Sequence, residues 1–264
     1  MKNKLERISY FVMCLVLIVF FLVLFIFFML TKLPIKIENY QLFLKNKKLN
    51  FSIRKIKDLK PVLMEKIESE EIAYYMYRDV YLEEHKEFFK EIRYDITILK
   101  PLIIGKEYNK TFGHYHPIAE DNLSYPEIYE VLQGEAIFLL QSADLKKVIL
   151  IFAKEGDQVI ILPNYGHVTI NIGKNDLIIA NLVYRNFESN YKPFEEKEGA
   201  AIYYTIDGII KNPNYENFEI EIKNVKRIFD DEIYFSFIKN PEKFEFLKKP
   251  SKLKEWDKTY LLIS

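Results

Sequence analysis

Residues 111–134, TFGHYHPIAEDNLSYPEIYEVLQG, contain two of the chain's four histidines, His114 and His116, separated by a single residue. In a β-strand, side chains two residues apart lie on the same face, so we expect both imidazoles to point the same way. The same alternation places Glu127 and Tyr129 on one face of a later strand. The segment therefore predicts two strands that direct imidazole, carboxylate and phenol groups toward one cavity.

A third histidine lies in HVTINIG, residues 167–173, which also alternates in polarity. The polar face of this predicted strand carries His167, Thr169 and Asn171, and the apolar face carries Val168, Ile170 and Ile172. Each histidine taken alone is typical of an exposed hairpin or loop. Together, three imidazoles and the Glu127 carboxylate form a ligand set suited to a first-row divalent metal, with octahedral positions left open for substrate or water.

From residue 92 onward the chain consists of short runs rich in β-branched and aromatic residues, separated by Gly, Asn, Asp and Pro. Examples are YDITIL, EIYEVLQ, KKVILIFAK, QVIILP and LIIANLVY. Regularly spaced short runs of this kind predict an antiparallel sandwich or barrel, so the expected fold class is all-β.

The composition limits the possible functions. The chain has 264 residues and 49% hydrophobic content, which allows one substantial domain plus appendages. Lys and Arg number 38, as do Asp and Glu, so no excess of positive charge indicates a nucleic-acid partner. The single cysteine, Cys14, excludes an internal disulfide framework.

Residues 8–30, ISYFVMCLVLIVFFLVLFIFFML, contain no charged residue, Pro or Gly. As a helix this run would span about 34 Å, enough to cross the apolar core of a bilayer. The alternative is a cleaved signal peptide, but its apolar region is normally about 7 to 15 residues long. We therefore predict a single-pass membrane helix, and the lysines that follow it favour a cytoplasmic main domain.

The motifs GHYHP…YPEIYEVLQGEAIFLLQ and VIILPNYGHVTINIG resemble those of the cupin-type (archaeal-type) glucose-6-phosphate isomerases over about residues 70–215. A generic cupin shares only the pattern His-x-His…Glu…His, whereas TxGHYH, PEIYEVLxG and PxxxHxTxNxG together are specific to this branch. The resemblance implies a cupin fold, a small β-barrel of the jelly-roll type with flanking helices. It also implies a divalent metal, usually Fe(II) with Ni, Mn and Zn as alternatives, bound by His114, His116, Glu127 and His167.

The implied reaction is the interconversion of glucose 6-phosphate and fructose 6-phosphate. On a cis-enediol route, Glu127 would move the proton between C2 and C1 with Tyr129 as its hydrogen-bond partner, and a hydride shift is the other route. The resemblance places substrate contacts on Thr97, Thr111, the N–H group of Gly113, Tyr184 and Tyr191. Thr97 and Tyr184 also fit an ordinary strand. Some members have a histidine where this chain has NFESN, residues 186–190, so this loop departs from the pattern of those members.

These patterns divide the chain into an N-terminal tail (1–7), a membrane helix (8–30) and a tether that could contain a strand (31–60). A cupin isomerase domain (61–210) and an extension with a strand and two short helices (211–264) follow. Two other functions stay open: a membrane-anchored, non-catalytic cupin that binds sugar phosphate, and a cupin epimerase or dioxygenase. A homodimer is also compatible with the sequence.

Overall fold

The computed structural model describes residues 13, 16–19, 32–225 and 227–255. The chain divides into two compact units, Met1–Pro34 and Ile35–Ser264. Most of the predicted membrane helix, residues 8–30, lies outside the described residues. Those that are described, Met13 and residues 16–19, are helical and exposed. No helix among the described residues is both long and apolar enough to cross a membrane.

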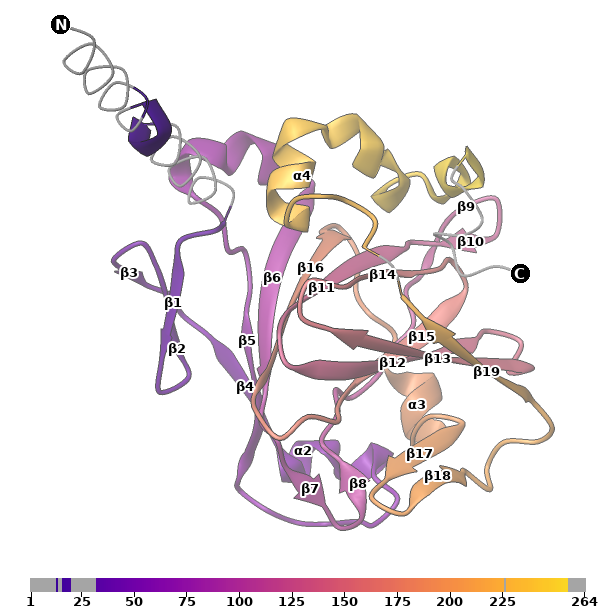
Figure 1. Ribbon diagram of the computed structural model, residues 1–264. Helices are drawn as coiled ribbons and strands as arrows, with labels where there is room; N and C mark the ends of the chain where they lie inside the picture. Colours follow the sequence, from indigo (N-terminus) through magenta and orange to yellow (C-terminus); the bar gives the residue numbers. More distant parts are fainter. Residues whose placement is uncertain (1–12, 14–15, 20–31, 226, 256–264) are drawn as a thin grey trace, which may run out of the picture. The chain divides into compact units, whose positions relative to one another are not determined.

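Two large β-sheets form the body of the second unit (Figure 1). The larger has the strand order β14-β11-β16-β6-β5-β4, with bounds β4 Ser52–Lys55, β5 Ile72–Tyr77, β6 Ile92–Leu99, β11 Glu127–Gln133, β14 Gln158–Ile161 and β16 Leu177–Tyr184. The smaller has the order β15-β12-β13-β19, with bounds β12 Glu135–Ser142, β13 Lys147–Lys154, β15 Tyr165–Asn171 and β19 Glu219–Asn224. All pairs are antiparallel except β13 with β19. The chain is thus mostly β, as predicted.

The side chains of strand β11 point alternately to the two faces of the larger sheet, and the two sets differ in their surroundings. Tyr129 pairs with Asn181 of β16, and Glu127 pairs with Val183. Because side chains alternate, these residues share one face, while Ile128 and Glu130 point to the other. Ile128 and Glu130 are both buried. The register of β11 and β16 therefore assembles a polar cavity on one side of the sheet and a packed layer on the other.

Most of the range predicted as a tether, residues 31–60, is folded: the part from Ile35 onward belongs to the second unit. It contains the three-stranded sheet β1 Ile35–Glu38, β2 Gln41–Leu44 and β3 Lys47–Lys48, then β4, α2 Ile56–Leu59 and η1 Lys60–Val62. Leu42 and Leu44 are buried, and the Leu42 N–H donates to the Tyr77 hydroxyl at 3.0 Å. The apolar residues of this range are therefore inward-facing strand positions, which corrects the tether prediction.

Shorter elements complete the second unit. They are η2 Glu83–Phe89, β7 Ile103–Ile104, β8 Glu107–Tyr108, β9 Ile118–Glu120, β10 Leu123–Ser124, α3 Lys192–Glu196, β17 Ile202–Thr205 and β18 Gly208–Lys211. The last two strands join β7 and β8 in a four-stranded sheet.

The C-terminal extension contains β19 and the helices α4 Ile233–Lys239, η3 Pro241–Leu247 and η4 Pro250–Glu255. Pro241 and Pro250 begin the two 3₁₀ helices, where a missing N–H group has no helical partner to lose. Tyr234 of α4 stacks on Phe89 of η2, with ring centroids 5.2 Å apart. The extension is therefore packed through aromatic rings beside the end of β6 and β16 (Figure 1).

Candidate active site

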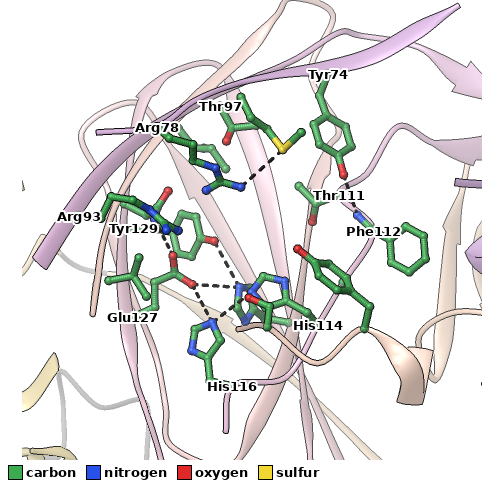
Figure 2. A pocket seen from close by; sticks show the side chains of 18 of the residues that line it. Tyr74, Arg78, Arg93, Thr97, Thr111, Phe112, His114, His116, Glu127 and Tyr129 are labelled. Carbon is green, nitrogen blue, oxygen red and sulfur yellow. Dashed lines mark hydrogen bonds and ion pairs between the residues drawn. The ribbon is translucent and has the colours of Figure 1, made fainter. Parts of the chain in front are cut away.

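One pocket contains every residue that the sequence analysis proposed for the site (Figure 2). The proposed residues that line it are Thr97, Thr111, Gly113, His114, His116, Glu127, Tyr129, His167, Tyr184 and Tyr191. They come from β6, β11, β15 and β16, from residues 111–116 and from the loop after β16. The structure therefore brings the two sequence motifs together in one cavity.

Three imidazoles and one carboxylate converge at one end of the pocket. The Nε2 atoms of His114 and His116 are 3.1 Å apart. The Glu127 Oε2 atom lies 3.2 Å from His167 Nε2 and 3.5 Å from His116 Nε2. One potential ligand atom from each residue lies within 4.8 Å of all the others.

The sequence analysis expected His114 and His116 on a regular strand, and the backbone differs from that expectation. His114 forms an isolated antiparallel bridge with His167, in which the His167 N–H donates to the His114 carbonyl at 3.1 Å. Tyr115 forms a second isolated bridge, with Asn190, and His116 and Pro117 lie outside any strand before β9. The two imidazoles still reach the same cavity because the segment is extended there.

The contacts around the ligands orient their free atoms. His116 Nδ1 lies 2.8 Å from the Tyr125 carbonyl oxygen, which can only accept a hydrogen bond, so Nδ1 carries the hydrogen and Nε2 keeps its lone pair. The Asn181 amide donates to Glu127 Oε1 at 2.6 Å. The other oxygen of Glu127, Oε2, is buried and has no hydrogen-bond partner among the described residues. The lone pairs of His116 Nε2 and Glu127 Oε2 are therefore available to a bound cation.

The protonation states suit a cation. Burial holds the pKa of His114 well below its usual value and lowers the pKa of His116 to about 4, so both rings are neutral at neutral pH. Burial alone would raise the pKa of Glu127, but the neighbouring His167 and His116 reverse that effect and lower it. Neutral imidazoles and an ionised carboxylate are the forms that bind a metal.

The observed spacing also fits a metal ion. Bonds of about 2.0 to 2.2 Å from nitrogen or oxygen to a divalent ion put neighbouring ligand atoms about 3 Å apart. The three measured separations of 3.1, 3.2 and 3.5 Å agree with that value. Together with the buried, unpaired Glu127 Oε2, this spacing shows that the residues fit a divalent cation.

Sequence analysis missed a group of arginines in the same pocket, Arg54, Arg78 and Arg93. Asp95, which is fully buried, accepts from Arg78 Nη1 at 2.5 Å and from Arg93 Nε at 2.7 Å. An available signal was the charged pair Arg93 and Asp95 within the predicted strand IRYDITIL, residues 92–99. Arg54 had no such signal because it lies in the range assigned to the tether.

Arg54 differs from the other two arginines because it forms no ion pair with a described residue. Its Nε atom is buried and has no hydrogen-bond partner among the described residues. Its guanidinium carbon lies 5.2 Å from the centre of the Phe112 ring, beside Thr111 and Gly113. Tyr74, which accepts the Phe112 N–H at 3.3 Å, lines the same part of the pocket (Figure 2). A cationic donor thus lies beside Phe112 in the pocket that the Tyr74 and Thr111 hydroxyl groups also line.

Comparison with known proteins identifies relatives. The family model of Glucose-6-phosphate isomerase (GPI) matches residues 53–221, more than half of the chain. The glucose-6-phosphate isomerase of Pyrococcus furiosus is 27% identical over 176 residues, which cover 62% of this chain and 88% of that protein. The Thermococcus gammatolerans enzyme of the same name is 28% identical over 171 residues, covering 62% of this chain and 86% of that protein.

Among solved structures, an oxalate decarboxylase from Lactobacillus farciminis in complex with formate is 22% identical, with a TM-score of 0.33, over 45% of this chain and 30% of that chain. A resemblance at this level carries no argument about the reaction. The match of the family model begins at Ile53, within β4, and so includes Arg54 and both histidine motifs. This chain therefore belongs to the glucose-6-phosphate isomerase family.

Proposed function

We propose that this protein is a metal-dependent isomerase that interconverts glucose 6-phosphate and fructose 6-phosphate. Membership of the family supports the reaction, and the convergence of His114, His116, Glu127 and His167 in one buried cluster supports the metal. A divalent ion held by these residues would act as a Lewis acid on the sugar oxygens. Fe(II) is the metal that we propose, with Mn, Ni and Zn as alternatives.

The residues beside the cluster can hold and move protons. Burial and the neighbouring Glu127 raise the pKa of Tyr129 well above its usual value, so this phenol keeps its proton at neutral pH. The Tyr129 hydroxyl lies 3.3 Å from His167 Nε2, and the ionised Glu127 is held in place by Asn181. Glu127 can take the C2 proton on an enediol route, although metal ligation lowers its basicity. A hydride shift fits the same arrangement.

At the other end of the pocket, Arg54 supports a phosphate subsite. Its guanidinium supplies the positive charge that a phosphate requires, and the hydroxyls of Thr97 and Thr111 supply further donors. Thr111 Oγ1 accepts the Thr169 N–H at 2.9 Å, which leaves the hydroxyl proton of Thr111 available. We place the phosphate at this end and the C1 and C2 atoms of the sugar at the histidine end.

A membrane anchor over residues 8–30 is also part of the proposal. The described residues of this range, Met13, Val16, Leu17, Ile18 and Val19, are all apolar, and each is between 47% and 60% exposed. Exposed apolar helix residues are typical of contact with lipid. The proposed location is a single-pass membrane protein with a cytoplasmic catalytic domain, and a homodimer stays a prediction.

The test uses the full chain in detergent, stripped of metal and reloaded with Fe(II), Mn(II), Ni(II) or Zn(II). We expect fructose 6-phosphate to be converted to glucose 6-phosphate only when metal is present. The variant Glu127→Gln should abolish turnover, whereas Glu155→Gln, an exposed residue in a turn, should leave it unchanged. Saturable binding of fructose 6-phosphate without turnover under any metal would instead identify a non-catalytic binding protein.

A further inference from the structure

The loop after β16 places an aromatic ring against one of the proposed metal ligands. Phe187 lines the pocket, and its ring centroid lies 4.6 Å from that of His116, with the two planes at 52°. Phe187 is partly buried, whereas its neighbours Asn186 and Glu188 are exposed. Of these three consecutive side chains, the aromatic one is therefore the one directed inward.

Phe187 is also connected to His116 by a second route. Its ring stacks on Tyr125, with centroids 5.0 Å apart and planes at 11°. Tyr125 in turn stacks on Tyr184 of β16, at 4.9 Å and 24°. The carbonyl oxygen of Tyr125 is the acceptor for His116 Nδ1. The aromatic stack thus holds the backbone group that sets the tautomer of His116.

The loop that carries Phe187 is tied to the rest of the protein at both ends. At its start, Arg185 forms an ion pair with Asp79 and donates from Nη2 to the Phe89 carbonyl at 2.8 Å. At its end, Asn190 exchanges two backbone hydrogen bonds with Tyr115, of 2.8 and 3.0 Å. Tyr115 lies between the two histidines in sequence, so the loop is linked directly to the ligand-bearing segment.

We infer that Phe187 is a positioning residue for His116: through its contact with the imidazole and its stack on Tyr125, it sets the affinity of the site for a divalent metal. A ligand whose ring is already fixed loses less conformational entropy when the metal binds. Groups that orient a metal ligand typically change affinity by about 10-fold to 100-fold. The inference rests on the proposed metal site but not on turnover.

The test measures binding of Co(II) alone to the metal-free full chain in detergent, by the visible absorption of the bound ion and by competition with a chelator. Phe187→Ala should weaken Co(II) binding about 10-fold. Phe187→Tyr, which keeps the ring, should bind as the parent does. Tyr125→Ala should weaken Co(II) binding to a similar extent, although Tyr125 is not among the residues that line the pocket. Tyr125→Phe, which keeps the ring, should leave Co(II) binding unchanged.

The control is Phe88→Ala, because Phe88 is 38% exposed and packs on Phe237 outside the pocket. If Phe187→Ala does not fold, Phe187→Leu replaces it and should also bind Co(II) more weakly, since it keeps apolar volume without a stacking ring. Co(II) binding within twofold of the parent in Phe187→Ala, or in Phe187→Leu where that variant replaces it, would overturn the inference. Co(II) binding within twofold of the parent in Tyr125→Ala would overturn it as well. A parent that binds Co(II) but never isomerises sugar would overturn the proposed function alone.

Discussion

The three arginines of the pocket differ in whether a carboxylate pairs with them. Asp95 pairs with both Arg78 and Arg93, so its one carboxylate offsets part of the positive charge that these two arginines bring to the cavity. Arg54 keeps a buried nitrogen, Nε, without a hydrogen-bond partner among the described residues. A buried donor without a partner is unfavourable unless a ligand satisfies it, which makes Arg54 the residue most directly suited to an anion.

Removing the Arg54 guanidinium should weaken substrate binding more than catalysis. A charge-assisted hydrogen bond contributes about 1.5 to 3 kcal/mol, so Arg54→Ala should raise KM for fructose 6-phosphate about 10-fold to 100-fold. Steady-state kinetics, with inorganic phosphate as a competitive inhibitor, measure the effect. Lys55→Ala is the control because Lys55 follows Arg54 on β4 but pairs with the exposed Glu70. An unchanged KM in Arg54→Ala would place the phosphate elsewhere.

Position 113 requires glycine because of its positive φ angle and because neighbouring side chains leave no room for a Cβ atom. Its φ is +87°, and a Cβ atom there would lie 2.7 Å from Val168 Cγ2 and 2.9 Å from Phe194 Cδ1. Gly113→Ala should therefore destabilise the protein by about 1 to 3 kcal/mol. Thermal unfolding compares it with Gly208→Ala, where φ is +108° but nothing lies within 4 Å. Equal losses in the two variants would show that packing at Gly113 contributes nothing.

Strand β11 connects the pocket to the C-terminal extension through its two faces. Glu127 points into the pocket, while Glu130 accepts the Ile233 N–H of α4 at 2.8 Å and the Gln158 amide at 3.3 Å. Burial raises the pKa of Glu130 to about 7. The extension is therefore attached to the sheet through a buried acid.

The raised pKa of Glu130 makes stability depend on pH. Between its unfolded value of 4.5 and about 7, the folded state keeps a proton that the unfolded state has lost. The free energy of unfolding should therefore fall as pH rises through this window, by at most about 3 kcal/mol. Urea denaturation of the parent and of Glu130→Gln should show this fall in the parent only. A fall of the same size in the variant would assign the effect to other groups.

At the scale of the whole molecule, the unit Ile35–Ser264 contains both large sheets, the pocket and the C-terminal extension. A chain that begins at Lys32 should therefore fold and keep metal-dependent isomerase activity, because Arg54 is the first of the described residues that line the pocket. The full chain should float with lipid vesicles, and the shortened chain should stay in the aqueous fraction. A shortened chain that still floats would contradict the proposed anchor.

Prediction from sequence succeeded where the pattern is local. Alternation grouped Glu127 with Tyr129, and the runs bounded by Gly and Pro predicted β11, β12, β13 and β16. It failed for residues 31–60, because four short strands and a single turn of helix leave only a weak periodic signal. The start of the folded domain was therefore placed too late.

The sequence by itself determined which side chains share a face within one strand, because that alternation depends only on the local backbone. Only the tertiary structure decided that Arg54, Tyr74 and Phe187 join the histidines in one pocket. These residues come from β4, β5 and a loop that are far from the histidine motifs in sequence. The side chains of Arg54 and Tyr74 face the cavity because of the pairing register between β4 and β5, and a shift of one residue would turn them away.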